Sequence, residues 1–233
     1  MYLNTRVFTL SLCSAFVKMF GVTTEKPYAG KLADERRAER RERLVAAGFD
    51  LLGTEGTAGT SVRAVCARAG LSSRYFYESF ANIDELLVAV FDDVTTRTLG
   101  QSTQVFLDPG ATIESAVRAV GETFVVMSRD ERAMRIGFIE AWGSEAVMRR
   151  RVAYLHGSAQ LLSTFACEKS GVPSDRRAGV DVAAFMVVGG LLEAILGWID
   201  GSLDVDGTTL VKHFTPAAVA AIERAIADAK REN

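Results

Sequence analysis

The sequence predicts an all-α fold for this chain of 233 residues. Apolar residues recur three and four positions apart in the long segments, which is the spacing that lines one face of a helix. Few runs alternate with period two, and only four prolines interrupt the chain. Hydrophobic residues make up 48% of the sequence, so a sizeable core can form.

The most informative element runs from Thr60 to Phe80, where two short helices flank a tight turn. Thr60 or Ser61 can cap the first helix, and Gly70 follows its last turn, where a positive φ favours glycine. Two helices that cross steeply over such a turn form a helix-turn-helix; a helical hairpin within another all-α protein is the alternative. The second helix exposes groups that can donate to phosphates and base edges: Ser72, Ser73, Arg74, Tyr75 and Tyr77.

A helix is predicted over residues 32–55, before this motif, and the GTEG segment at 53–56 ends it with a glycine stop. A dense charge run, DERRAERRER, lies near its start. Most of these arginines are expected to form a solvated face. A positive arm before a helix-turn-helix often reaches phosphates, so Arg37 and Arg41 are candidates for that contact.

A third helix is predicted after the motif. Asn82 is a good N-cap, and Glu85 three residues later completes a capping box. This helix runs to about Leu107, after which Asp108-Pro109-Gly110 breaks the chain.

Taken together, residues 34–100 resemble the DNA-binding domain of the tetracycline-repressor (TetR) family of bacterial transcriptional regulators. The pattern GLSSRYFYESFANIDELL carries the resemblance. It implies that Tyr77, Thr60 and Ser61 hold phosphates, and that Ser72, Ser73, Arg74 and Tyr75 face bases. The family usually has a lysine where this chain has Ile83, so we expect a salt dependence shallower by about one phosphate.

The resemblance also implies a domain organisation. Residues 31–81 are the N-terminal three-helix helix-turn-helix domain, residues 82–108 a connecting helix, and residues 109–233 a C-terminal helical domain for ligand binding and dimerisation. Residues 1–30 are interpreted as a flexible extension or an over-long start, with an amphipathic accessory helix as the alternative. A signal peptide is disfavoured because Lys18 interrupts the apolar run and no small-residue cleavage site follows.

Charge and cysteine content narrow the functional classes. The net charge is −2, and residues 31–97 hold ten basic and eleven acidic residues. Weak non-specific DNA binding is therefore expected, with affinity set by charge placement. Three scattered cysteines and two distant histidines predict no metal site, disulfide framework or cofactor. The absence of catalytic motifs argues against an enzyme, and a reducing cytoplasm fits the cysteine usage.

The resemblance implies a small-molecule pocket in the C-terminal domain. Its apolar and aromatic candidates, for which plain core packing is the alternative, are Phe124, Met127, Phe138, Trp142, Phe165 and Met186. Glu193 and His156 are the polar candidates. A carboxylate among apolar neighbours is costly unless it is paired or protonated, so a salt bridge is the alternative role for Glu193.

The segment Val182–Ile199 holds a single charge in eighteen residues. A membrane span is one interpretation, and a helix buried in a dimer is the preferred one. The last helix is predicted to start at Thr215, with Pro216 in its first turn. In the resembled family the last two helices pair across a two-fold axis, which points to Leu191, Ile195, Ala218, Ile222 and Ala225; packing within one subunit is the alternative.

The sequence thus predicts a cytoplasmic homodimeric regulator that binds a double-stranded DNA operator, with no membrane contact. Two recognition helices would read successive major grooves, so the operator should be an inverted repeat. Repression, with release by a small hydrophobic effector of unknown identity, is the leading hypothesis. A constitutive or architectural DNA-binding protein without a ligand is the alternative.

Overall fold

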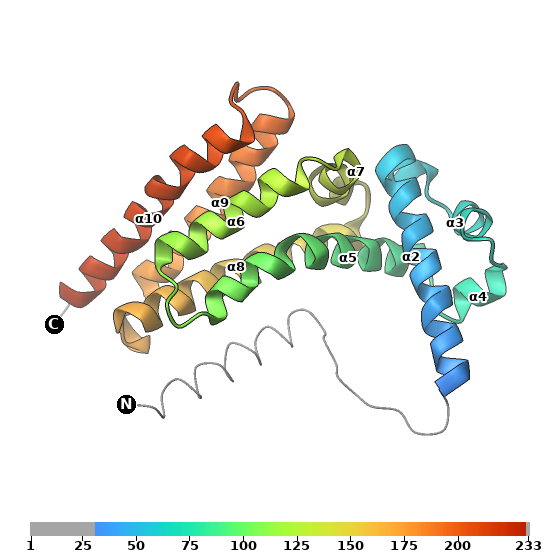
Figure 1. The fold of residues 1–233 in the computed structure, drawn as a ribbon, viewed down its shortest axis with the longest axis horizontal. Helices are drawn as coiled ribbons and strands as arrows, with labels where there is room; N and C mark the ends of the chain where they lie inside the picture. Colours follow the sequence, from blue (N-terminus) through green and yellow to red (C-terminus); the bar gives the residue numbers. More distant parts are fainter. Residues whose placement is uncertain (1–30, 232–233) are drawn as a thin grey trace. The chain divides into compact units, whose positions relative to one another are not determined.

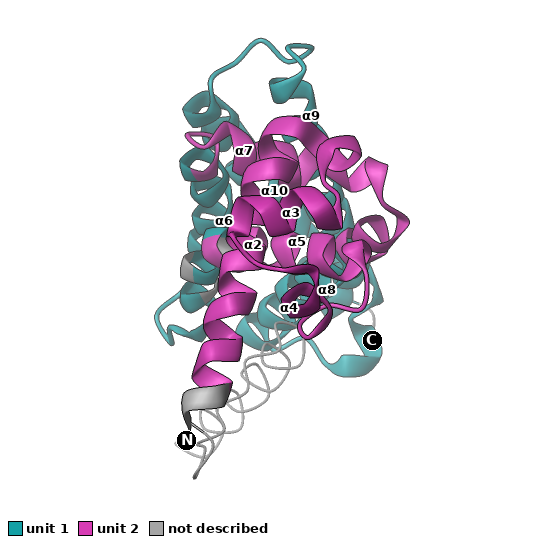
Figure 2. Cartoon of the chain, turned by 90° about the vertical axis from the view of Figure 1, so that its right-hand side faces the viewer, with its two compact units in different colours: residues 1–19, 98–126, 152–233 teal, residues 20–97, 127–151 magenta. Residues whose placement is uncertain are grey.

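The computed structural model describes residues 31–231, without the side chains of residues 31–33, 99, 101 and 103. The extension predicted at residues 1–30 lies outside this part of the chain. All regular elements of the described residues are helices (Figure 1), which confirms the all-α prediction. The described chain divides into two compact units, residues 31–97 with 127–151 and residues 98–126 with 152–231 (Figure 2).

The first unit begins with α2 (Lys31–Gly59), which is longer than the predicted helix. Gly56 does not end this helix but interrupts it, with φ 73° and ψ −175°, and one further turn follows to Gly59. That combination of angles is accessible almost only to glycine. The kink lies directly before the helix-turn-helix, so it determines the direction in which the chain enters the motif.

The helix-turn-helix forms as predicted. Ser61 caps α3 (Val62–Ala69) by accepting from the Ala64 N–H at 3.2 Å. Gly70 ends α3 in the left-handed conformation with φ 63°. The second helix, α4 (Ser73–Tyr77), follows with Ser72 at its N-cap position.

The helix α5 (Ile83–Thr103) begins at the predicted capping box. Asn82 Oδ1 accepts from the Glu85 N–H at 3.0 Å, and Glu85 Oε2 accepts from the Ala81 N–H at 2.7 Å. A 3-10 turn, η1 (Gln104–Leu107), follows α5. The helical stretch therefore ends at Leu107, where the sequence predicted its end.

Residues 127–151 belong to the same compact unit as the DNA-binding motif, although they were predicted as part of the C-terminal domain. They form α7 (Glu131–Met134), the π-helical turn η2 (Arg135–Ile139) and the 3-10 turn η3 (Glu140–Gly143). All three pack against α2. A Cβ atom on Gly53 would lie 2.5 Å from Arg132 Cβ, so this glycine permits the close approach.

The second unit is built from α6 (Ile113–Met127), α8 (Glu145–Ser170), the short turn η4 (Ser174–Arg176), α9 (Ala178–Ile199) and α10 (Gly207–Arg231). Residues 145–151 of α8 and residue 127 of α6 fall in the first unit. Phe106, Phe165 and Ile222 are among the residues of its buried core. The helices α9 and α10 lie side by side (Figure 1).

The last helix begins earlier than predicted. Asp206 Oδ1 accepts from the Thr209 N–H at 2.6 Å, so the helix is capped there and α10 starts at Gly207. Pro216 lies inside α10 rather than in its first turn.

By length and composition alone, α9 could cross a membrane. Its most apolar window has a mean hydropathy of 2.1, and 28% of that window is buried within the chain. A core helix of a soluble protein meets the same criteria, so this observation is weak evidence for a span.

Candidate nucleic-acid interface

The recognition helix α4 stands on a fully buried aromatic anchor. The Phe76 side chain has no exposed surface, and its ring packs 5.7 Å from that of Phe80, which is also buried. Burial of side chains of this size supplies most of the energy that holds such a short helix in place. The opposite side of α4 therefore has a defined orientation toward solvent.

The residues predicted to face DNA all have exposed side chains. Ser72, Ser73, Arg74, Tyr75 and Tyr77 are all exposed. Tyr77 is 60% exposed, and the Arg74 side chain 85%. These positions present hydroxyl and guanidinium donors on one short helix, which is the chemistry that binds phosphates and base edges.

Thr60 and Ser61 have different positions. Ser61 is exposed and caps α3, as predicted. Thr60 is only 5% exposed, and its hydroxyl donates to the Gly56 carbonyl at 2.8 Å. Because this hydroxyl is buried and occupied, Thr60 stabilises the kink in α2 and cannot meet a phosphate in this conformation, contrary to the prediction.

The arginine run of α2 is directed at the motif. Arg41 lies over the Phe80 ring, with its guanidinium carbon 5.0 Å from the ring centroid. Arg43 donates to the Ala69 carbonyl at 2.6 Å, where α3 ends. A cation at a helix C-terminus compensates the partial negative charge of the unpaired carbonyls. Arg43 is therefore structural, whereas Arg41 remains exposed beside the recognition helix.

Three arginines converge on Glu78, the residue that ends α4. Arg74 Nε donates to Glu78 Oε1 at 3.2 Å, and Arg40 Nη2 lies 3.6 Å from Glu78 Oε2. Arg37 Nη2 donates to the Glu78 carbonyl oxygen at 2.6 Å. We call these four residues the Glu78 cluster. Sequence reasoning missed Glu78, although its i,i+4 spacing from Arg74 was visible.

A second polar cluster joins the kink of α2 to residues 135–140. Glu140 Oε2 accepts from the Thr57 N–H at 2.8 Å, and Glu140 Oε1 from Arg135 Nε at 2.7 Å. Arg135 Nη1 donates to the Thr54 carbonyl at 3.1 Å. Burial alone would raise the pKa of Glu140, but the hydrogen bonds from Thr57 and Arg135 hold this pKa below its ordinary value.

The predicted ligand-binding residues do not form one lining. Phe165, Met127 and Phe138 are buried, and Phe124 is partly buried. The others face solvent: Trp142 is 73% and Met186 67% exposed, and His156 and Glu193 are exposed as well. The His156 ring packs 5.3 Å from the Phe185 ring on α9, at the surface.

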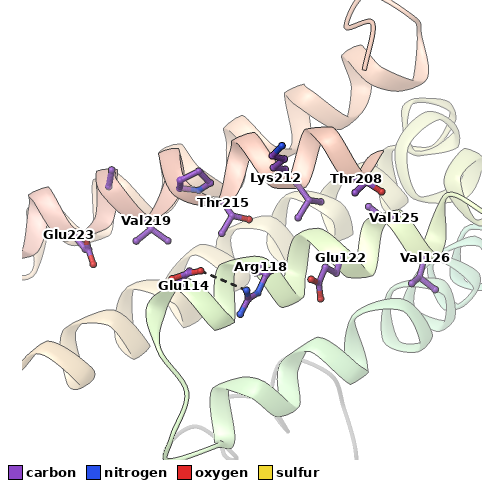
Figure 3. A pocket seen from close by; sticks show the side chains of 13 residues that line it. Glu114, Arg118, Glu122, Val125, Val126, Thr208, Lys212, Thr215, Val219 and Glu223 are labelled. Carbon is purple, nitrogen blue, oxygen red and sulfur yellow. Dashed lines mark ion pairs between the residues drawn. The ribbon is translucent and has the colours of Figure 1, made fainter. Parts of the chain in front are cut away.

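A groove of about 730 Å³ lies between α6 and α10, and no predicted ligand residue lines it (Figure 3). Its apolar lining comes from Val125, Val126, Val211, Pro216, Val219 and Ala220. Charged side chains of both signs also line it, among them the Glu114–Arg118 pair at 3.8 Å. Thr215 also lines the groove, and its hydroxyl is buried without a hydrogen-bond partner among the described residues.

The predicted dimer residues lie on the inner faces of their helices. Leu191, Ile195, Ala218 and Ile222 are at most 6% exposed, and Ala225 is partly buried against the core. They pack within one subunit, which was the alternative interpretation. The face of α9 that is exposed instead carries Val182, Phe185, Met186, Gly189, Gly190 and Glu193.

The two short helices, the left-handed glycine between them and the exposed donors of α4 define a helix-turn-helix DNA-binding protein. Residues 44–90 match the family model described as "Bacterial regulatory proteins, tetR family". The helix-turn-helix region is therefore a DNA-binding domain of the tetR family of bacterial regulatory proteins. Regulators of this family are in general non-enzymatic, soluble DNA-binding proteins, and they act as dimers.

Several solved structures have a similar fold. The fatty acid degradation regulator FadR from Bacillus halodurans is 16% identical, with a TM-score of 0.60 over 83% of this chain and 96% of that one. The transcriptional regulator FadR from Bacillus subtilis, in complex with stearoyl-CoA, is 15% identical, with a TM-score of 0.62 over 78% of this chain and 98% of that one.

A transcriptional regulator from Rhodococcus sp. RHA1 is 22% identical, with a TM-score of 0.56 over 79% of this chain and 96% of that one. At these identities the likeness concerns the fold. No curated protein matches the chain.

Proposed function

We propose that this protein is a repressor that binds an inverted-repeat operator as a homodimer and leaves it when a small, mostly apolar effector binds. The observation that carries the DNA-binding part is the row of exposed donors on α4 above the buried Phe76. A helix anchored in this way can enter a major groove with its outer face against the base edges. In this proposal the protein acts in the cytoplasm and binds double-stranded DNA.

Within α4 the two kinds of DNA contact are divided by position. Ser72, Ser73, Arg74 and Tyr75 start the helix and meet base edges, because N-terminal residues of a recognition helix lie deepest in the groove. Tyr77 and Ser61 bind phosphates, and Arg37 and Arg41 add charge from α2. Phosphate contacts set the register of the protein, while base contacts select the sequence.

Dimerisation uses the exposed face of α9. Val182 is 61% and Met186 67% exposed, which is unusual for a helix of such high mean hydropathy. A Cβ atom on Gly189 or Gly190 would meet nothing within 4 Å, so a second helix can approach closely there. Ala220 and Ala221 of α10 are exposed as well. Pairing of α9 and α10 with their copies buries these surfaces.

The effector binds in the groove between α6 and α10. Its valines favour an apolar molecule, and the buried hydroxyl of Thr215 can reach a polar group of that molecule after a change of χ1. The charges at the groove are of both signs, which favours an uncharged body over a strongly charged one. The aromatic residues predicted from the sequence remain the second candidate lining.

Binding of the effector acts by population shift. The effector prefers a dimer in which the two recognition helices are wrongly spaced for DNA, and DNA in turn weakens effector binding by the same factor. The helix α5, which continues from residues 83–97 of one unit into the other, is the proposed lever.

Footprinting of the purified protein on the DNA upstream of its own gene tests this proposal. We expect a protected inverted repeat, and protection that is lost when an apolar effector from a metabolite panel is added. Tight operator binding that no compound weakens, with no compound stabilising the protein to heat, would favour the constitutive DNA-binding alternative. The absence of any sequence-selective protection would refute the DNA-binding function itself.

A further inference from the structure

Glu78 places a carboxylate beside the helix that is proposed to enter the DNA. A negative charge in this position repels phosphates and weakens sequence-independent binding. The side chain is 35% exposed, and both of its carboxylate oxygens face arginines. The Glu78 cluster therefore needs an explanation other than affinity for DNA.

The geometry of Arg74 supplies that explanation. The Glu78 carboxylate accepts a hydrogen bond from the Nε–H of Arg74, and neither Nη atom of Arg74 donates a hydrogen bond to any described residue. In the commonest specific contact, a guanine base offers two acceptors, O6 and N7, to two N–H groups of an arginine. Glu78 thus occupies a donor that this contact does not need.

Arg40 contacts the second oxygen of the Glu78 carboxylate. Its guanidinium carbon lies 4.6 Å from the centroid of the Tyr75 ring, and its Nη2 is close to Glu78 Oε2. The Arg40 side chain is only 23% exposed, so it is less mobile than a free surface arginine. Arg40, on α2, therefore orients the Glu78 carboxylate independently of Arg74.

We propose that Glu78 is a positioning residue that holds Arg74 ready for the major-groove edge of a guanine and so sets the sequence discrimination of α4. This inference rests on the proposed DNA-binding function and extends it to a residue that touches no base. A free arginine side chain loses considerable rotamer entropy when it binds, and pre-orientation by Glu78 reduces that loss at the guanine contact only.

The experiment compares affinities for the footprinted operator and for a random duplex of the same length. Glu78→Ala should lower the ratio of the two affinities roughly fivefold or more, because part of the discrimination of an arginine–guanine pair is lost. Glu78→Gln keeps an acceptor for Nε but removes the charge, so it should retain more of the ratio. Exposed ion pairs add little stability, so both variants should fold, which a thermal melt checks.

Glu42 provides a matched control. It is exposed on α2 and has no hydrogen bond or ion pair with another described residue. Glu42→Ala removes the same charge near the motif, so both affinities should rise together and leave their ratio unchanged. A ratio that falls equally in Glu42→Ala and Glu78→Ala would show a general charge effect and would overturn the positioning role.

A double-variant comparison locates the effect. Arg74→Ala combined with Glu78→Ala should discriminate no worse than Arg74→Ala alone, and both single variants should lose preference at the same base pair. Additive losses, or an unchanged ratio in Glu78→Ala, would overturn the proposal. If the wild-type protein shows no preference for any DNA sequence, the proposed DNA-binding function is refuted. If the wild type is selective and Glu78→Ala has the same affinity ratio, only the role of Glu78 is refuted.

Nuclear magnetic resonance gives a readout that needs no DNA. In the free wild-type protein the Nε–H of Arg74 should exchange slowly with water, because it is held by the carboxylate. The same resonance should exchange rapidly in Glu78→Ala and remain slow in Glu42→Ala. Rapid exchange in the wild type would contradict the positioning role.

Discussion

The carboxylate of Glu140 accepts a hydrogen bond from the backbone N–H of Thr57 at 2.8 Å, although the two residues are 83 positions apart in the sequence. Thr57 directly follows the kink at Gly56, and the helix-turn-helix begins a few residues later. Glu140 also binds Arg135, which is itself bonded to the Thr54 carbonyl. Residues 135–140 thus hold the last turn of α2, and through it the entry to the DNA-binding motif.

Replacement of Glu140 should destabilise this unit. Glu140→Gln weakens charge-assisted hydrogen bonds to Thr57 and Arg135, and we expect a loss of about 1–3 kcal/mol in the free energy of unfolding. Urea denaturation followed by circular dichroism measures the loss. Glu131→Gln, an exposed position of the neighbouring α7, should change the stability little. Equal stability of both variants and the wild type would contradict the account.

The contribution of Glu140 should depend on pH. Because its pKa in the folded state is lowered from the ordinary 4.5, the carboxylate contributes stability that is fully present above that value. The contribution disappears as the pH falls through the folded-state pKa and the carboxylate is protonated. The stability difference between wild type and Glu140→Gln should therefore shrink in acid; a difference that grows below pH 4.5 would have the wrong sign.

A side chain at Gly56 should disrupt the same contact. The backbone angles there are almost exclusive to glycine, and a Cβ atom would lie 2.9 Å from Arg135 Nη2 and 3.0 Å from the Glu140 carboxylate. We expect Gly56→Ala to cost about 1–3 kcal/mol of stability from backbone strain alone. Gly179→Ala is the control, since a Cβ atom there meets nothing within 4 Å. Equal melting temperatures for the two variants would argue against strain.

These contacts mark where sequence reasoning stops. Ser61, Gly70 and Asn82 were predicted because each acts on backbone groups within a few residues. Glu140 was not predicted, because its partner Thr57 lies 83 positions away in the sequence. Its neighbour Arg135 likewise binds the Thr54 carbonyl across 81 positions, and no local pattern joins these residues. Glu78 lies between these cases, since one partner is local and another comes from α2.

The helices of the other unit show a second limit. Pro216 favours a first turn by local rules, yet it lies inside α10, because the helix is capped earlier by Asp206. In α9 nearly every residue is apolar, so periodicity carried too little contrast to separate Leu191 and Ile195, which are buried, from Met186, which is exposed.

Arg74→Ala should reduce the discrimination between operator and random DNA by about 1–3 kcal/mol, as expected for a bidentate contact with a base. Competition binding with operator variants at single base pairs measures this loss. The Arg74 side chain is 85% exposed, so the folded state should be unaffected. An equal loss on every sequence would reassign Arg74 to a phosphate.

Tyr77→Phe removes one hydroxyl from a side chain that is 60% exposed. We expect weaker binding to all DNA sequences alike, by about 0.5–1.5 kcal/mol, because a phosphate contact carries no sequence information. Filter binding on operator and random duplexes checks this. Unchanged affinity for both would exclude Tyr77 from the backbone contacts.

The most direct test of the central claim concerns paired copies of α4 on one operator. Met186→Glu introduces a charge on the exposed face of α9, whereas Leu203→Glu does so in the loop before α10. Sedimentation and footprinting should show a wild-type and Leu203→Glu dimer that protects two half-sites about 34–36 Å apart, and a Met186→Glu monomer that protects neither. A wild-type protein that is a strict monomer, or that protects a single unpaired site, would contradict the account.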